Sequence, residues 1–311
     1  MGVSMRIQSI VACAAAAPLL LAATPLPVRL QPSSPWVVDY AENTCRLIRT
    51  FGEGKTVVKL AFESDAPGSM DMLALGKPLQ TSDERVSARF LPVGGKPFEG
   101  NVAATVPKGD PAILWSNVAM LPDELLAKFK KAQDEQKLHP DDRPPSITLT
   151  PSESPRALRQ QFATAATELE IDGRRSHPVI LETGSLGEAM AAFDKCSDDS
   201  LTDWGVDPQL EAKIVRPVWA LNPSHWLSSA DYPGDMLRKG SESEVNVRLL
   251  IDASGKVTKC TSLSHYEAPE FNRISCEKIT KRARFEPAEL ADGTKVPSYY
   301  IQRVVFRIAP F

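Results

Sequence analysis

The sequence predicts an α+β protein, in which a β-rich N-terminal domain is followed by a two-layer domain of helix, hairpin, helix and strand. Two observations support this class. Short β-rich runs, separated by Gly, Pro, Asp or Ser clusters, fill much of the first 120 residues. The last eighty residues then alternate between helical and strand patterns. With 311 residues, 42% of them apolar and 24% charged, the chain has room for two globular domains.

The N-terminus has the pattern of a secretory signal peptide. Arg6 precedes an apolar run of fourteen residues from Ile10 to Ala23, which ends in small residues. A membrane-spanning helix needs about 20 apolar residues, so cleavage near Ala23 is the preferred interpretation, with residues 1–23 as the signal. Retention of this segment as an inner-membrane anchor is the alternative. Cys13 lacks the surroundings of a lipid-attachment site.

Residues 33–203 are predicted to form one mainly β domain, to which the sequence assigns no role. The expected strands cover residues 56–63, 70–76, 86–93, 98–106 and 111–119, and a hairpin is expected from 165–171 and 179–181. Residues 122–137 predict an amphipathic helix, and a second helix follows the capping-box pattern from Ser185 to Glu188. Residues 204–230 are predicted as a linker to the C-terminal domain, residues 231–311.

The C-terminal domain has a clear order of elements. Residues 244–252 alternate apolar and polar side chains, residues 253–256 are turn formers, and residues 257–264 are again β-rich, which predicts a hairpin. A helix then begins at Pro269, with acidic residues early and basic residues late, the order that the helix dipole favours. Residues 296–308 form the expected last strand.

Four cysteines follow the predicted signal, and an even number in an exported chain indicates two disulfides. Cys260 lies in the second strand of the hairpin and Cys276 in the helix expected to pack on it, which predicts the first pair. Cys45 begins a strand and Cys196 lies on the apolar face of the helix that follows Ser185. Their pairing is the second prediction, and it rests partly on elimination.

The sequence predicts no catalytic, metal or cofactor site. Gly52-Glu-Gly-Lys-Thr56 lacks the first glycine of a phosphate-binding loop, and Gly184 to Gly187 is not a nucleophile elbow. A zinc site built with His225 or His265, the alternative use of the cysteines, lacks the usual ligand spacing. The net charge of −3 gives no reason to expect a nucleic-acid partner. We therefore expect a non-enzymatic protein.

Four blocks of the C-terminal segment stand out: Tyr232-Pro233, the turn Asp252–Val257 that contains Gly255, the block Arg282–Ala288 that contains Arg284, Phe285 and Pro287, and the following Asp292-Gly293. In their order and spacing, these blocks resemble the C-terminal domain of TonB family proteins. The resemblance covers about residues 228–311. It implies a two-layer α+β domain that recognises outer-membrane receptors by pairing a receptor segment with the edge of its last strand. Force-transmitting members also carry an uncleaved membrane helix and a long Pro-rich stretch, whereas the 26 prolines of this chain are scattered.

The last strand carries the predicted partner site. Alternation places five residues on one face, with the more apolar opposite face expected to meet the helices. The five are Tyr299, Ile301, Arg303, Val305 and Arg307. A chain-terminal strand after a helix commonly lies at a sheet edge, where unpaired backbone groups accept an extended peptide. Pairing of this edge with a second copy, to give a homodimer, is the alternative.

Two functional hypotheses follow. The preferred one is an exported periplasmic protein whose TonB-type domain binds a protein partner, such as an outer-membrane receptor segment, by strand addition and without force transmission. The alternative is an energy transducer component, anchored in the inner membrane, that couples to outer-membrane receptors in transport.

Overall fold

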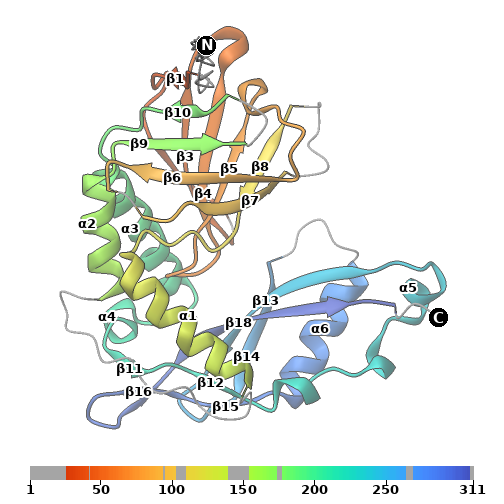
Figure 1. The fold of residues 1–311 in the computed structure, drawn as a ribbon. Helices are drawn as coiled ribbons and strands as arrows, with labels where there is room; N and C mark the ends of the chain where they lie inside the picture. The colour runs from red at the N-terminus through yellow and green to blue at the C-terminus, as the bar shows by residue number, and fades with distance from the viewer. Residues whose placement is uncertain are drawn as a thin grey trace, which may run out of the picture.

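The computed structural model contains a large ten-stranded domain and a smaller C-terminal domain beneath it (Figure 1). Both helices and strands are present in each part, which confirms the predicted α+β class. The structure describes residues 26–41, 43–93, 95–102, 110–138, 154–173, 177–263 and 269–308.

The N-terminal domain is one strongly curved sheet in the strand order β1-β10-β9-β6-β7-β8-β5-β4-β3-β2. All neighbouring strands are antiparallel except β1 and β10. The strands are β1 (Val28–Leu30), β2 (Val37–Tyr40), β3 (Cys45–Phe51), β4 (Val58–Ser64), β5 (Asp71–Leu75), β6 (Arg85–Leu91), β7 (Phe98–Val102), β8 (Ala112–Trp115), β9 (Glu168–Asp172) and β10 (Val179–Leu181). The end of the expected strand 98–106 lies outside the described residues.

The segment after β1 closes this sheet on itself. β1 pairs with β10, and the residues that follow it bridge to the end of β3 through Pro32 and Phe51. The Ser33 N–H donates to the Thr50 carbonyl at 2.9 Å, and the Gly52 N–H donates to the Gln31 carbonyl at 2.8 Å. Closure removes an exposed strand edge and encloses the side chains on one face. The folded domain therefore begins before residue 33, the predicted boundary.

Aromatic side chains fill the interior of the closed sheet. Phe90 lies between Phe62 and Phe98, with ring centroids 6.4 and 5.7 Å away. The Trp115 ring packs beside Gly100, where an added Cβ would come within 2.5 Å of the indole, and its N–H donates to the Val86 carbonyl at 3.0 Å. The interior is thus a packed core, of the kind that stabilises a domain through burial of apolar surface.

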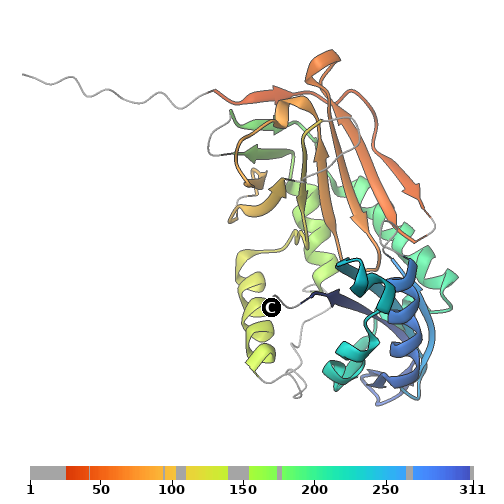
Figure 2. The same ribbon diagram turned by 90° about the vertical axis from the view of Figure 1, so that its right-hand side faces the viewer.

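Helices α2 (Pro155–Ala165) and α3 (Gly187–Asp203) pack against each other beside this sheet (Figure 1). The Cys45–Cys196 disulfide joins β3 to α3, as the sequence predicts. The predicted capping box does not form, because α3 begins one residue later than expected and Leu186 takes the N-cap position. The Ser185 hydroxyl instead donates to the Thr164 carbonyl at 2.9 Å and links α3 to α2. A further helix, α1 (Asp123–Leu138), follows β8 and stands away from the sheet (Figure 2).

The C-terminal domain is a three-stranded sheet with α6 (Pro269–Arg282) against one face (Figure 1). Its strand order is β14-β13-β18, with β13 (Ser243–Ile251), β14 (Val257–Ser262) and β18 (Ser298–Phe306). α5 (Gly234–Arg238) precedes the sheet, which gives the predicted order of helix, hairpin, helix and strand. The Cys260–Cys276 disulfide joins β14 to α6, as predicted. With both pairs formed, these cysteines supply no thiolate for a zinc site.

The segment 204–230, expected to be a linker, supplies structure to the C-terminal domain. It contains α4 (Pro208–Glu211), β11 (Ile214–Arg216) and β12 (Trp219–Leu221). β12 pairs with β15 (Arg284–Glu286), and β11 pairs with β16 (Ala288–Leu290), which continues to β17 (Lys295–Val296). Trp226 is buried against Phe285, with ring centroids 5.1 Å apart. These pairings give the segment a fixed place, which its weakly periodic sequence does not predict.

Candidate partner-binding edge and domain interface

β18 lies at the end of its sheet. Among the described strands it pairs with β13 alone, in a register that places Arg303 opposite Asn246. The Asn246 carbonyl accepts a hydrogen bond from the Leu263 N–H at 2.8 Å, so the backbone of Asn246 faces β14. In an antiparallel ladder the N–H and C=O of one residue point to the same neighbour. The backbone groups of Arg303 therefore point away from β13, and those of Ile301 and Val305 do the same.

The side chains of β18 alternate between the core and an open face. Val304 and Phe306 are buried beneath α6, whereas Ile301 and Val305 are 37% and 50% exposed. Arg303 forms an ion pair with Glu244 on the neighbouring strand. Because both partners of that pair are partly exposed, it contributes at most about 1 kcal/mol to stability.

The basic end of this edge continues past the strand. The Arg307 guanidinium lies 3.6 Å from the Glu242 carboxylate, and the Ile308 N–H donates to the same carboxylate at 2.7 Å. The Gln302 side chain donates to the Arg303 carbonyl at 2.6 Å, which leaves the Arg303 N–H as the outward donor. The open edge thus combines outward backbone groups with two apolar and two basic side chains.

Tyr299 does not share the open setting predicted for this face. Its hydroxyl donates to the Pro67 carbonyl at 2.8 Å, and its ring lies edge-on to Trp204 with centroids 5.7 Å apart. Pro67 lies in the loop between β4 and β5, and Trp204 is the C-cap residue of α3, so Tyr299 is part of a contact between the two domains. Burial raises the pKa of Tyr299 well above its usual range. The edge available to a partner therefore begins at Ile301.

Arg248, in the middle of β13, is the centre of this domain contact. It is 4% exposed, and its guanidinium lies 3.6 Å from the centre of the Trp204 ring. It donates to the Asn43 side-chain oxygen at 3.1 Å and approaches the Asp65 carbonyl at 3.5 Å. Burial lowers the pKa of Arg248 to about 10. Its partners are the Trp204 ring, two neutral oxygens and the charge of the nearby Asp65 carboxylate, which favours the protonated guanidinium. All of them come from the ten-stranded domain, so the desolvated charge depends on that domain being in place.

No sequence pattern marked Arg248 or Trp204 as interface residues. Arg248 alternates with apolar neighbours in β13, a pattern that is typical of a residue facing water. Trp204 follows α3 in a segment with no recognisable motif. Only the docking of one domain on the other brings these two side chains together.

The residues that carry the family resemblance have structural roles away from the open edge. The Tyr232 hydroxyl donates to the Ser241 carbonyl at 2.6 Å, and Pro233 caps the start of α5. Gly255 has φ +84°, and a Cβ there would come within 2.0 Å of the Phe285 carbonyl oxygen. These contacts join the hairpin turn and the N-terminal helix to the rest of the domain.

The remaining motif residues lie around the end of α6. Arg284 donates to the Lys281 and Ala283 carbonyls at 3.1 and 2.7 Å. Pro287 follows β15, whose central residue, Phe285, is buried. The motif therefore specifies the fold of the domain and does not form its candidate binding edge.

Asp231 joins the start of the domain to α6. It accepts hydrogen bonds from Arg282 at 2.6 and 3.1 Å and from the Ser228 backbone and hydroxyl at 2.9 Å. The Arg282 hydrogen bonds hold the pKa of the Asp231 carboxyl well below its usual range. The buried carboxylate is thus paired with a guanidinium and with the Ser228 backbone and hydroxyl groups.

The C-terminal domain is thus a small two-layer α+β unit in which β18 forms one end of the sheet. Residues 228–308 match the family model described as the Gram-negative bacterial TonB protein C-terminal. The C-terminal part of this chain is therefore a TonB family C-terminal domain, as its motifs predict. A comparison with curated proteins found no match to the chain.

The match covers residues 228–308 alone, and the family that it names is a non-enzymatic, transport-associated domain of the cell envelope that interacts with proteins. Within the described ranges, no helix has both the length and the apolar character required to cross a membrane. The predicted signal peptide, residues 1–23, lies outside the described residues, as does His265.

Proposed function

We propose that this protein is exported to the periplasm, where its TonB-type domain binds a protein partner by strand addition to β18 without transmitting force. The observation that carries the proposal is the outward direction of the Ile301, Arg303 and Val305 backbone groups at the end of the sheet. An extended receptor segment would extend the sheet by one strand. Main-chain hydrogen bonds would supply affinity, and the exposed side chains would supply selectivity.

The domain contact supports a role without force transmission. The C-terminal domain is held to the ten-stranded domain through Arg248 and Tyr299, in addition to the chain connection itself. A transducer needs a C-terminal domain that reaches from one membrane to the other. A domain fixed to a folded neighbour is better suited to an adaptor or a scaffold.

Photo-crosslinking in cells tests the binding edge. A photoreactive amino acid at Val305 should crosslink to an envelope protein, whereas the same group at Val215, on β11, should not. The two positions are 50% and 49% exposed, so accessibility alone cannot explain a difference. Equal crosslinking at both positions, or none at Val305, would contradict the proposal, and a product of twice the chain mass would support the homodimer.

The N-terminus decides between the adaptor and the transducer. N-terminal sequencing of the protein from the envelope fraction should find a mature start near Thr24. An intact, membrane-associated Met1 would instead support the energy-transducer alternative, in which the chain stays anchored in the inner membrane. This result is independent of where the partner binds.

A further inference from the structure

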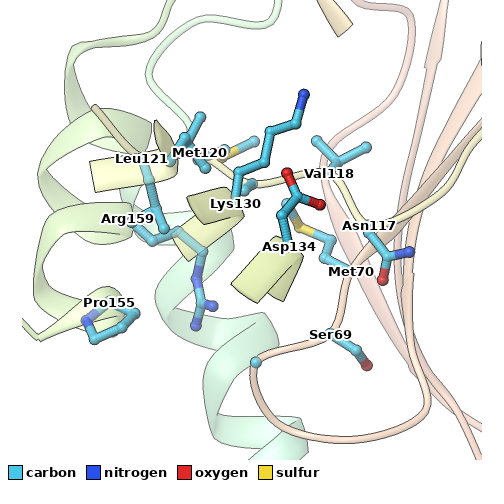
Figure 3. A pocket seen from close by; sticks show the side chains of 13 residues that line it. Ser69, Met70, Asn117, Val118, Met120, Leu121, Lys130, Asp134, Pro155 and Arg159 are labelled. Carbon is cyan, nitrogen blue, oxygen red and sulfur yellow. The ribbon is translucent and has the colours of Figure 1, made fainter. Parts of the chain in front are cut away.

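A pocket of about 550 Å³ lies outside the edge and the domain contact (Figure 3). Helices α1 and α2 form one side of it, and two loops of the ten-stranded domain, residues 68–70 and 117–121, form the other. Its volume is within the range of about 300–1,000 Å³ that is usual for small-molecule sites. The strand-addition proposal does not use this pocket.

Apolar side chains form the inner wall. Met70, Val118 and Met120 line the pocket and are buried, and Leu126 of α1 reaches it while half-buried. Methionine side chains are flexible and polarizable, so they adapt to apolar ligands of irregular shape. This wall therefore fits a hydrocarbon chain or ring.

The charged side chains of the pocket are not equivalent. Arg159 is neutralised by an ion pair with the buried Asp194 of α3, and Asp134 is engaged in an interaction of its own. Lys130 is exposed and makes no ion pair with any residue that the structure describes. Figure 3 shows its amine extended away from the helix at the edge of the pocket. Lys130 is thus the lining cation that has no partner among the described residues.

We propose that this pocket binds an amphipathic organic anion, with its apolar part on Met70, Val118 and Leu126 and its acidic group paired with Lys130. The apolar wall would supply most of the affinity, because burial of apolar surface is the larger contribution. Lys130 would supply the preference for an anion over a cation of the same shape.

Decanoate is the probe for this site, and decyltrimethylammonium is its cationic counterpart. Titration of the full chain should show saturable binding of one decanoate and weaker binding of the cation. Labelled methionine methyl groups locate the ligand by NMR: the signals of Met70 and Met120 should shift, while that of Met236, in the C-terminal domain, should not. Absence of saturable decanoate binding, or shifts spread evenly over all methionines, would overturn the proposal.

Variants of α1 separate the two parts of the site. Lys130→Gln should weaken decanoate binding by about threefold to fivefold, the ratio expected for one partly exposed ion pair. Leu126→Ser should weaken it by about tenfold through loss of apolar contact. Lys128→Gln is the matched control, because Lys128 is an exposed lysine of the same helix that does not line the pocket. Equal affinities for the Lys130 and Lys128 variants would refute the role of Lys130.

Discussion

Replacement of Arg303 by proline removes the outward backbone N–H of β18 and so tests whether a partner binds to it. The N–H of Arg303 points away from β13, so a proline there removes no hydrogen bond of the β13–β18 ladder. Gln302, one residue earlier, pairs with Val247 and directs its backbone toward β13. Gln302→Pro therefore places the same ring on the same strand but removes a ladder donor. Arg303→Ala removes the side chain and keeps the N–H.

The three substitutions are expected to affect partner binding and folding stability differently. Loss of one main-chain hydrogen bond to a partner strand costs about 0.5–1.5 kcal/mol, which is about a twofold to tenfold loss of affinity. Both Arg303 variants lose the exposed ion pair with Glu244, which lowers the free energy of unfolding by at most about 1 kcal/mol. Gln302→Pro leaves a strand carbonyl without its donor, which costs about 1–3 kcal/mol more in folding.

Two assays on the same samples test this reasoning. Urea unfolding should rank the variants, with Gln302→Pro clearly less stable than Arg303→Pro. Calorimetric titration with an extended peptide from an outer-membrane receptor should show weaker binding to Arg303→Pro than to Arg303→Ala. A folded Arg303→Pro variant that binds the peptide with unchanged affinity would rule out this edge as the site.

Three further predictions concern contacts within the C-terminal domain and between the two domains. Arg282 lowers the pKa of Asp231 in the folded state, so the ionised carboxylate stabilises the fold by about 1–2 kcal/mol. This stabilisation is complete above the unfolded-state pKa, near 4, and is lost as the pH falls from there through the lower folded-state pKa. Asp231→Asn should flatten this pH dependence in urea unfolding, and an unaltered profile would contradict it. Arg248→Ala should speed amide exchange in the loops of the ten-stranded domain by about fivefold or more, because a cation–π contact and two polar contacts are lost. Unchanged exchange there would exclude a stabilising role of the Arg248 contact. Gly255→Ala should lower the free energy of unfolding by at least about 2 kcal/mol, because its Cβ would clash with the Phe285 carbonyl oxygen. Gly240→Ala, also at positive φ but in open space, should lower it by about 1 kcal/mol. Equal losses for the two variants would refute the clash at Gly255.

The local elements of the C-terminal domain follow closely from its sequence. The expected strand 244–252 is β13, from Ser243 to Ile251, and the expected helix begins at Pro269 as predicted. These elements were predictable because alternation of period two, turn residues and helix-end charges are all local signals. Both disulfide pairings could also be predicted from the sequence, because their cysteines lie on helices and strands whose positions could be predicted.

The ten-stranded domain was predictable in composition but not in arrangement. Most of its strands coincide with β-rich runs, but nothing in those runs shows that Pro32 bridges to Phe51 and closes the sheet. No local pattern predicts helix α2, and the linker predicted over residues 204–230 instead contains strands that pair with β15 and β16. Such pairings depend on partners far away along the chain, and short strands carry little signal of their own.

The sequence by itself determined which face of β18 each side chain occupies, because successive residues of a strand point to opposite sides. It could not determine what covers those faces. Tyr299 and Ile301 share one face, but the hydroxyl of Tyr299 contacts Pro67, 232 residues away, while Ile301 remains exposed. Arg248 has the sequence pattern of a solvent-facing residue and is buried by Trp204 and Asn43 of the other domain. Burial at a domain contact is a property of two surfaces together, and only the tertiary structure brings the second surface into place.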